Sequence, residues 1–378
     1  MRSIPGLLES WGASDEAKLA ARPRLRPRRV VATGPGSSEA HARYLVWFLN
    51  RFTDIPAEFL PTGALVEPVD PARFRDRTLV VFNQGLSAAG RIALGHRAGF
   101  DSTVLFTSAT AEGLRRSGRT ERLECLEPLE RDDTVEIIRF PLEDEYTILI
   151  RVVGPALGFL AARLWAGSFA RPGDFCGDPR SLGIEAARAF RAGRDAGHEA
   201  WPRMDGAAFS RGFVLLASPD LSEYLQNVVY KFVEGLFRPA PALQELLQFA
   251  HGPFQQLTAS PRPVVVLHRR CETESDQLRR IRQMARVPAS TAWPRPPGWC
   301  LRPTCWSSRP RAFSSRPCWM ASCTGRSTRW PGLAGGSTPR STTTSVRSGP
   351  ASRRAPVVRR VERSPRRSAR PVRRPRAA

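Results

Sequence analysis

Short β-branched segments alternate with helix-type segments along the first 285 residues, and this alternation limits the folds open to the chain. The strand-type segment RVVAT at residues 29–33, for example, leads into a polar loop and then into an amphipathic helical pattern. Alternation of this kind predicts a parallel sheet with helices on both faces, whose ligands bind at the carboxyl ends of the strands. The strands expected in the first half are residues 29–33, 57–60, 78–82, 102–108 and 135–140.

Helix-type segments lie between these strands, and the same alternation continues in the second half of residues 1–285. Helices are expected at residues 4–20, from the loop after the first strand to about residue 50, at 89–98 and at 146–165. After a link at about residues 172–211, we expect strands at 212–218 and 263–268 and helices at 222–237 and 272–284. The chain is therefore predicted to have an α/β fold with two tandem, doubly wound, parallel-sheet domains. The first is residues 1–195, including the N-terminal helix, and the second is residues 196–285, which lacks its C-terminal strands.

Composition changes abruptly after residue 285. Residues 286–378 contain 21 Arg, no Lys and one acidic residue, Glu362, whereas residues 1–285 contain 37 basic and 34 acidic residues. The tail has no apolar period, and it lacks Asn, Asp, Gln, His, Ile and Tyr. Three interpretations stay open: a basic arm that binds nucleic acid, a disordered extension, and the out-of-frame translation of a GC-rich gene. The last is favoured because the missing amino acids mostly have AT-rich codons, and it argues against nucleic acid as a partner.

The cysteines and the apolar segments argue against several classes of protein. Cys300 and Cys305, and likewise Cys318 and Cys323, are spaced as pairs, but they lie in a segment without structural period, whereas zinc sites need defined turns. The cysteines of the body are scattered, as in reduced cytosolic proteins. The longest apolar stretch is too short for a membrane span and is interrupted by Arg163, and the N-terminus has no signal-peptide pattern. We expect a cytoplasmic protein with no metal, no other cofactor and no membrane contact.

The most distinctive loop follows the first strand and reads TGPGSSE at residues 33–39. Gly36 lets the backbone approach a ligand closely, and Ser37 and Ser38 carry hydroxyl donors. The N-terminus of the next helix adds free N–H groups and a partial positive charge. The alternative is a plain helix cap in which a serine bonds the first turn. A dinucleotide-binding loop is a poor match, because the third glycine and the acidic strand-end residue are absent.

Two further patterns in the second half carry ionisable side chains. Lys231 and Glu234 are spaced to share one face of the expected helix, where a carboxylate beside an ammonium is suited to proton abstraction next to a carbonyl. The alternative is a surface ion pair. Residues 1–285 contain two Lys against 35 Arg, which favours a specific need for an ammonium group. His251 stands before Gly252-Pro253 and is expected in a loop, either as a proton-transfer group or as a packing residue.

Together, the TGPGSSEA loop, the Lys-x-x-Glu helix and the His-Gly-Pro turn resemble the isomerase half of glucosamine-6-phosphate synthase. More widely, they resemble proteins with two sugar-isomerase (SIS) domains, including fructosamine deglycases, over about residues 25–285. The resemblance implies that Glu234 moves a proton between C1 and C2 of a sugar and that Lys231 assists it. It also implies that His251 opens the sugar ring across a homodimer interface, and that Ser37 and Ser38 belong to the first sugar or phosphate loop.

The second ligand loop departs from that family. Its Ser-Gln-Ser-Gly-Glu-Thr corresponds to Asn-Gln-Gly-Leu-Ser-Ala at residues 83–88. Gln84 is retained and Ser87 is a partial substitute, whereas Gly85 and Leu86 supply neither a hydroxyl nor a carboxylate. Because a phosphate dianion needs several fixed donors, and because Leu86 is apolar, the loop predicts a sugar ligand without an obligatory phosphate. The family's C-terminal segment, which supplies a catalytic lysine, has no counterpart in the tail.

Two functions are consistent with these patterns. The first is an aldose–ketose isomerase or deglycase-like enzyme that acts on a sugar or amino-sugar derivative. The second is a module that binds such a carbohydrate derivative without catalysis. The intact Lys-x-x-Glu and His-Gly-Pro elements favour the enzyme, whereas the altered second loop and the missing C-terminal segment favour the binding module.

Overall fold

The computed structural model describes residues 4–66, 70–140, 153–175, 177–200, 202, 206–252, 262–267, 276, 279 and 283. All of these described residues belong to one compact unit. The tail at residues 286–378, with its four cysteines, therefore lies outside the described residues, as does most of the helix predicted at residues 272–284.

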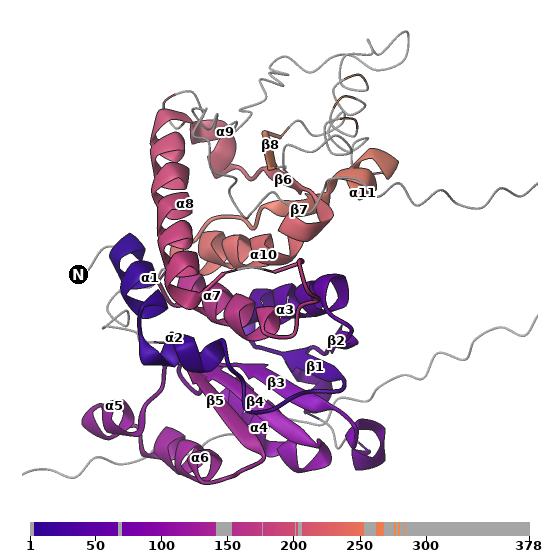
Figure 1. The fold of residues 1–378 in the computed structure, drawn as a ribbon. Coiled ribbons are helices and arrows are strands. Elements are labelled where there is room, and N and C mark those ends of the chain that lie inside the picture. The colour runs from indigo at the N-terminus through magenta and orange to yellow at the C-terminus, as the bar shows by residue number, and fades with distance from the viewer. Residues whose placement is uncertain are drawn as a thin grey trace, which may run out of the picture. The chain divides into compact units, whose positions relative to one another are not determined.

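Five parallel strands form the first sheet, in the order β2-β1-β3-β4-β5 (Figure 1). The strands are β1 (Val30–Thr33), β2 (Ala57–Phe59), β3 (Thr78–Phe82), β4 (Ser102–Thr107) and β5 (Val135–Arg139). β1 pairs with β2 on one side and with β3 on the other. The chain thus leaves β1 and β3 toward opposite edges of the sheet, and the carboxyl ends of these two strands form a topological switch point, where doubly wound sheets bind ligands.

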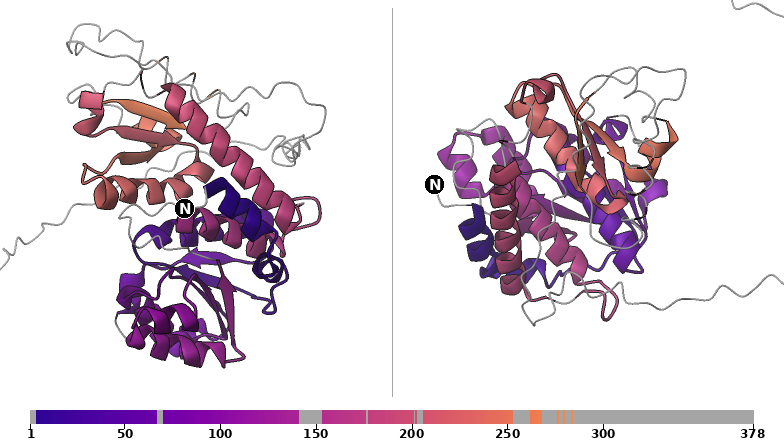
Figure 2. Two further views of the ribbon diagram at one scale, coloured as in Figure 1. Left: turned by 90° about the vertical axis from the view of Figure 1, so that its left-hand side faces the viewer. Right: turned by 90° about the horizontal axis from the view of Figure 1, so that it is seen from above.

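Alternate residues of the strands face two separate cores, because side chains of a strand point to opposite sides. Val80 and Phe82 belong to one core, and Leu79 and Val81 belong to the other. The first core is closed by α1 (Ile4–Gly12), α2 (Asp15–Ala20), α3 (Glu39–Phe52), α7 (Val153–Gly167) and α8 (Pro179–Ala200). The second is closed by α4 (Ala88–Gly95), α5 (Ala111–Arg116) and α6 (Thr120–Glu130). Helices therefore cover both faces of the sheet (Figure 2).

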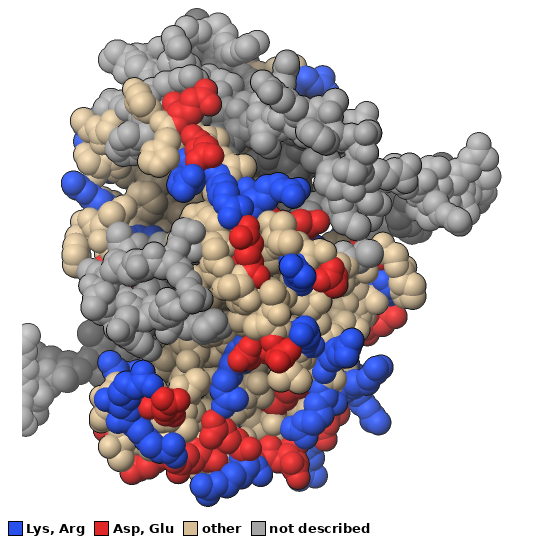
Figure 3. Space-filling model, turned by 60° about the vertical axis from the view of Figure 1, so that its left-hand side comes forward, with Lys and Arg blue, Asp and Glu red and all other residues tan. Residues whose placement is uncertain are grey.

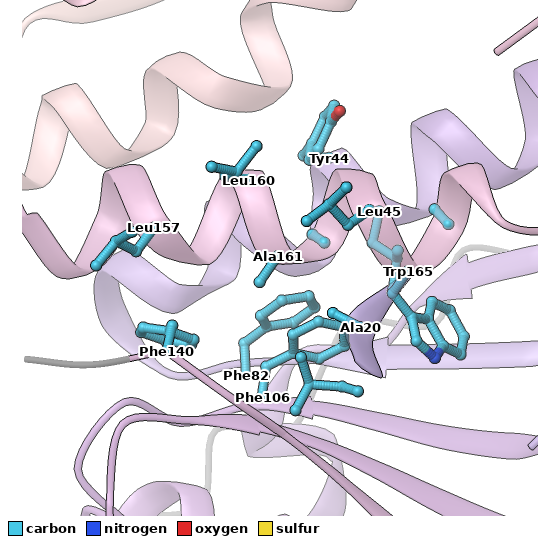
Figure 4. Packing of buried hydrophobic residues seen from close by; sticks show 14 of the residues in the cluster. Ala20, Tyr44, Leu45, Phe82, Phe106, Phe140, Leu157, Leu160, Ala161 and Trp165 are labelled. Atoms are coloured by element: carbon cyan, nitrogen blue, oxygen red, sulfur yellow. The ribbon is translucent and has the colours of Figure 1, made fainter. Parts of the chain in front are cut away.

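Large aromatic side chains fill the first core. The rings of Phe82 and Phe106, from neighbouring strands, stack with their centroids 4.4 Å apart, and Trp165 of α7 meets Phe106 edge to face. Figure 4 shows these rings beneath α7, below Leu160 and Ala161. Burial of each such side chain contributes about 1.5–3 kcal/mol, so this core is a main source of stability for the first sheet.

A second parallel sheet has the order β7-β6-β8. Its strands are β6 (Val214–Ala217), β7 (Ala242–Glu245) and β8 (Val264–Leu267). Its helices are α9 (Gly206–Ser210), α10 (Pro219–Tyr230), which continues into a π-helical turn at Lys231–Gly235, and α11 (Leu246–His251). The loops of the first sheet, in contrast, contain 3-10 turns at Gly36–Ser38, Thr62–Leu65, Pro71–Phe74 and Arg97–Gly99. The described part of the second sheet is thus parallel and carries helices, like the first.

The α/β fold class with two parallel sheets is confirmed, whereas several local predictions are wrong. The predicted link at residues 172–211 contains α8, a helix of 22 residues, and the proposed boundary between residues 195 and 196 falls inside it. Strand β7 and the helices α5, α6 and α11 were not predicted. The division into residues 1–195 and 196–285 stays a prediction.

Charged side chains on the body are mixed in sign. On the face drawn in Figure 3, basic and acidic side chains are interspersed over the described residues. Among the described residues, charged side chains pair, as Arg91 does with Glu121 at 2.9 Å and Arg115 with Glu127 at 2.6 Å. Each exposed pair contributes about 0–1 kcal/mol. None of the described helices combines the length and the apolar character that a membrane-crossing helix needs.

Candidate functional site

The loop after β1 makes a turn that only glycine allows. A Cβ atom on Gly34 would lie 2.7 Å from the carbonyl oxygen of Ser38, so the chain folds back tightly on this residue. Gly36 has φ +57°, in the left-handed region that disfavours L side chains. The two glycines thereby place the 3-10 turn Gly36–Ser38 at the carboxyl end of β1, directly before α3.

The hydroxyls of Ser37 and Ser38 have no structural role that accounts for them. Ser38 is the N-cap residue of α3, yet its side chain makes no capping hydrogen bond. Among the described residues, neither hydroxyl takes part in a hydrogen bond, and both side chains are half-buried. The alternative of a plain helix cap therefore fails, and two hydroxyls stand beside the positive end of a 14-residue helix.

The loop after β3 uses its side chains internally. Ser87 caps α4 by accepting from the N–H of Gly90 at 3.4 Å, and its hydroxyl donates to Oδ1 of Asn83 at 3.3 Å. Leu86 has φ +52° and a fully buried side chain, packed in the second core of the first sheet. The expectation that Leu86 faces the ligand is therefore wrong, because the left-handed backbone turns its side chain into the core.

Gln84 stands at the centre of this loop. Its carbonyl oxygen accepts from the N–H of Ser108 at 3.0 Å and from the hydroxyls of Ser108 at 2.7 Å and Thr107 at 3.0 Å. Its side chain packs against α7, because a Cβ atom on Gly154 would lie 2.5 Å from Oε1 of Gln84. The hydroxyl protons of Ser87, Thr107 and Ser108 are thus already donated within the protein.

A cation at the second loop was not predicted from the sequence. Arg122 of α6 donates from Nη1 to the carbonyl oxygen of Gly85 at 2.6 Å. Residues 1–285 contain 35 Arg, and no sequence pattern distinguishes Arg122 from the others. Only the packing of α6 beside the loop identifies it.

Glu234 reaches the first loop from the second half of the chain. Its Oε1 lies 3.9 Å from the position that a Cβ atom on Gly36 would occupy. Asn227 of α10, about two turns earlier, is buried and donates from Nδ2 to the carbonyl oxygen of Ser37 at 3.1 Å. The structure therefore brings together three of the predicted site residues: Gly36, Ser37 and Glu234.

The surroundings of Glu234 are acidic on one side. The hydroxyl of Tyr230 donates to Oε2 of Glu39 at 3.4 Å, and Glu39 also pairs with Arg43 at 2.7 Å. Burial raises the pKa of the Tyr230 hydroxyl, and the nearby carboxylates of Glu39 and Glu234 raise that pKa further.

Lys231 and Glu234 lie in a π-helical turn rather than in the α-helix that was expected, and such turns are frequent at functional sites.

His41 of α3 is a second residue that the sequence did not reveal. Its ring is buried, stacks on Phe82 with centroids 5.5 Å apart, and donates from Nε2 to the carbonyl oxygen of Pro155 at 3.0 Å. Burial, helped by the positive charge of Lys231 and opposed by the hydrogen bond to Pro155, lowers the pKa of His41 to about 4. His41 is therefore neutral at pH 7.

Stability should consequently fall as the pH is lowered through the range between the unfolded and folded pKa values of His41, about 6.5 and about 4. In that range the unfolded chain binds a proton that the folded chain excludes. Between pH 7 and pH 5 this residue should remove about 2 kcal/mol of unfolding free energy. Urea unfolding of the wild type and of His41→Gln at both pH values measures the effect. The prediction fails if both proteins lose equal stability.

His251 is not placed as predicted. It is the last residue of α11, not part of a loop, and its side chain is exposed. Pro253 of the predicted turn lies outside the described residues. Among the described residues, no hydrogen bond or ion pair joins His251 to Glu234 or Lys231. Within the same residues there is also no group of three His, Cys, Asp or Glu side chains placed to hold a metal ion.

Comparisons with known proteins identify the fold. No family model matches the chain, and no curated protein matches it in sequence. Among solved structures, it is similar to the C-terminal domain of glucosamine-fructose-6-phosphate aminotransferase from Francisella tularensis, with a TM-score of 0.53 and 11% identity over 74% of this chain and 78% of that one. It is also similar to tagatose-6-phosphate ketose/aldose isomerase from Escherichia coli, with a TM-score of 0.52 and 16% identity over 75% and 77%. A third is glucosamine-6-phosphate deaminase from Thermotoga maritima, with a TM-score of 0.51 and 13% identity over 75% and 81%. The chain therefore has a mixed α/β fold with parallel sheets, which it shares with these proteins.

Proposed function

We propose that the chain binds a sugar or amino-sugar derivative at the carboxyl end of the first sheet and interconverts its aldose and ketose forms. The observation that carries this proposal is the approach of the Glu234 carboxylate to Gly36, beside the hydroxyls of Ser37 and Ser38. A carboxylate, two hydroxyls without partners among the described residues and a helix N-terminus thus meet at the switch point of the sheet. The named activities of structures with the same fold point to the same class of ligand.

In this proposal Glu234 is the general base. Its carboxylate removes the proton from C2 of the open-chain aldose, and the electron pair of that C–H bond forms the C1–C2 double bond of an enediol while O1 takes up a proton. The Glu234 carboxyl, whose proton exchanges with solvent, then protonates C1 as O2 gives up its proton and becomes the ketose carbonyl. The ammonium group of Lys231 stabilises the negative charge that develops on the sugar oxygens.

We further propose a homodimer in which the partner's His251 completes the site. The exposed position of His251 at the end of α11 leaves its ring available to a second copy. An imidazole near neutrality is suited to ring opening, which needs a proton moved between the ring oxygen and the anomeric hydroxyl.

The second candidate function is binding without catalysis. The observation that favours it is the second loop, where the hydroxyls of Ser87, Thr107 and Ser108 donate to acceptors within the protein. Binding and catalysis are separated by proton exchange at C2 of the sugar, which only the isomerase produces.

The same engaged hydroxyls support a ligand without an obligatory phosphate. Each hydroxyl has one proton, and a phosphate dianion must replace its hydration shell with several fixed donors. At the first loop, Ser37 and Ser38 have hydroxyls free for a sugar, whose hydroxyl groups both donate and accept. The ligand proposed here is therefore recognised through its sugar hydroxyls.

Paired titrations test this recognition. Glucose, fructose and glucosamine, each with its 6-phosphate, are titrated against the full chain by thermal shift. We expect the dissociation constants within each pair to agree within about threefold, and Ser38→Ala to weaken both about tenfold, which corresponds to 1.4 kcal/mol. Ser117→Ala, at an exposed helix end, is the matched control and should bind normally. Tenfold tighter binding of the phosphorylated partner, lost in Ser38→Ala, contradicts the proposal.

A further inference from the structure

An open pocket lies on the side of α3, and it begins at Arg43, one helical turn after Glu39. Its volume between α3, the edge strand β2 and α10 is about 400 Å³, which is within the range of small-molecule sites. Five of its lining residues recur on one face of α3, and they are Arg43, Val46, Trp47, Asn50 and Arg51. Phe59 of β2 and Glu223 of α10 complete the lining.

Glu223 is a half-buried acid without a partner. Among the described residues its carboxylate makes neither a hydrogen bond nor an ion pair within 4 Å. Burial raises the pKa of Glu223, and the nearby carboxylate of Glu39 raises it further, while Arg43 lowers it. Arg43 does not fully neutralise the Glu223 carboxylate, because Nε of Arg43 bonds Glu39 at 2.7 Å and the Arg43 guanidinium stacks over the ring of Phe59 at 4.2 Å.

Arg51 supplies the opposite charge. Its side chain is exposed at the pocket, and it makes no ion pair among the described residues. Asn50 is already committed, because its side-chain amide bonds both backbone groups of Ala57, at 2.8 and 2.9 Å. The pocket thus offers one carboxylate and one guanidinium without partners, with the indole of Trp47 beside them.

We propose that this pocket binds a small α-amino acid with an apolar side chain. Its ammonium group pairs with Glu223, its carboxylate pairs with Arg51, and its side chain packs on Trp47, Val46 and Phe59. A zwitterion matches the two unpartnered charges, whereas a neutral sugar leaves both unpaired and a simple anion or cation satisfies only one of them. The aromatic wall selects an apolar side chain over a charged one. This site is independent of the proposed sugar chemistry.

Isothermal titration calorimetry of the full chain with L-phenylalanine and L-leucine tests the proposal. We expect both amino acids to bind with submillimolar to low-millimolar affinity. N-acetyl-L-phenylalanine, which lacks the ammonium charge, and L-phenylalaninamide, which lacks the carboxylate, should each bind at least tenfold more weakly. These analogues test both charges on the unaltered protein, so the result does not depend on how any variant folds.

Variants then assign the two charges to residues. Glu223→Gln and Arg51→Gln should each weaken L-phenylalanine binding at least tenfold, whereas the exposed control Glu16→Gln should leave it unchanged. Absence of binding by both amino acids at 10 mM overturns the proposal. Equal binding of L-phenylalanine and its two analogues, or undiminished binding by Glu223→Gln, overturns it as well.

Discussion

Replacement of Gly183 by alanine is expected to remove about 2–3 kcal/mol of unfolding free energy, although it adds a single methyl group. Gly183 of α8 faces Gly12 of α1, and a Cβ atom on Gly183 would lie 2.6 Å from the carbonyl oxygen of Leu8 and 3.0 Å from Cα of Gly12. These are backbone atoms, so the two helices must separate. Separation exposes the side chains of Leu8 and Trp11, which are 3% and 1% exposed.

The matched control is Gly95→Ala, at the end of α4. A Cβ atom at Gly95 would meet nothing within 4 Å, so this change should be neutral or stabilise by up to about 1 kcal/mol. Chemical denaturation of both variants beside the wild type measures the difference. Equal stability of the Gly183 and Gly95 variants contradicts the close contact between α1 and α8.

Replacement of Glu234 by glutamine is expected to lower the isomerisation rate by about 10³-fold while the sugar still binds. The amide keeps the size and much of the hydrogen bonding of the carboxylate, but it has no basic oxygen with which to remove the C2 proton. Dissociation constants should change by less than about threefold, because the hydroxyls of Ser37 and Ser38 are untouched. The control Glu112→Gln, on the exposed face of α5, should keep full activity.

The first sheet was predicted well because its strands β1, β3 and β4 are short, buried and rich in β-branched residues. β3 was predicted at residues 78–82, where it lies, and β4 was predicted one residue too long. β7 was not predicted, because its sequence ALQE is polar and only half-buried at the edge of its sheet. α8 was taken for a link although Leu182, Ala186 and Phe190 recur at helical spacing and pack on the first core.

The candidate site was predicted only in part. Gly36, Ser37 and Glu234 come together because α10 packs on the 3-10 turn Gly36–Ser38, while their roles in binding and catalysis stay predictions. The burial of Leu86 depends on a left-handed backbone that is unusual for leucine. The roles of His41 and Arg122 depend on contacts with segments distant in sequence, at Pro155 and Gly85. No local pattern in the sequence encodes such contacts.

Deuterium exchange tests the central claim most directly. The full chain is incubated in D₂O with glucose, fructose, glucosamine and their 6-phosphates, and the C1 and C2 protons of the aldoses and the C1 protons of the ketoses are followed by NMR. The account predicts that at least one aldose exchanges its C2 proton while its ketose appears, and that Glu234→Gln abolishes both changes without abolishing binding. Binding without exchange in the wild type, or exchange that persists in Glu234→Gln, contradicts the role assigned to Glu234.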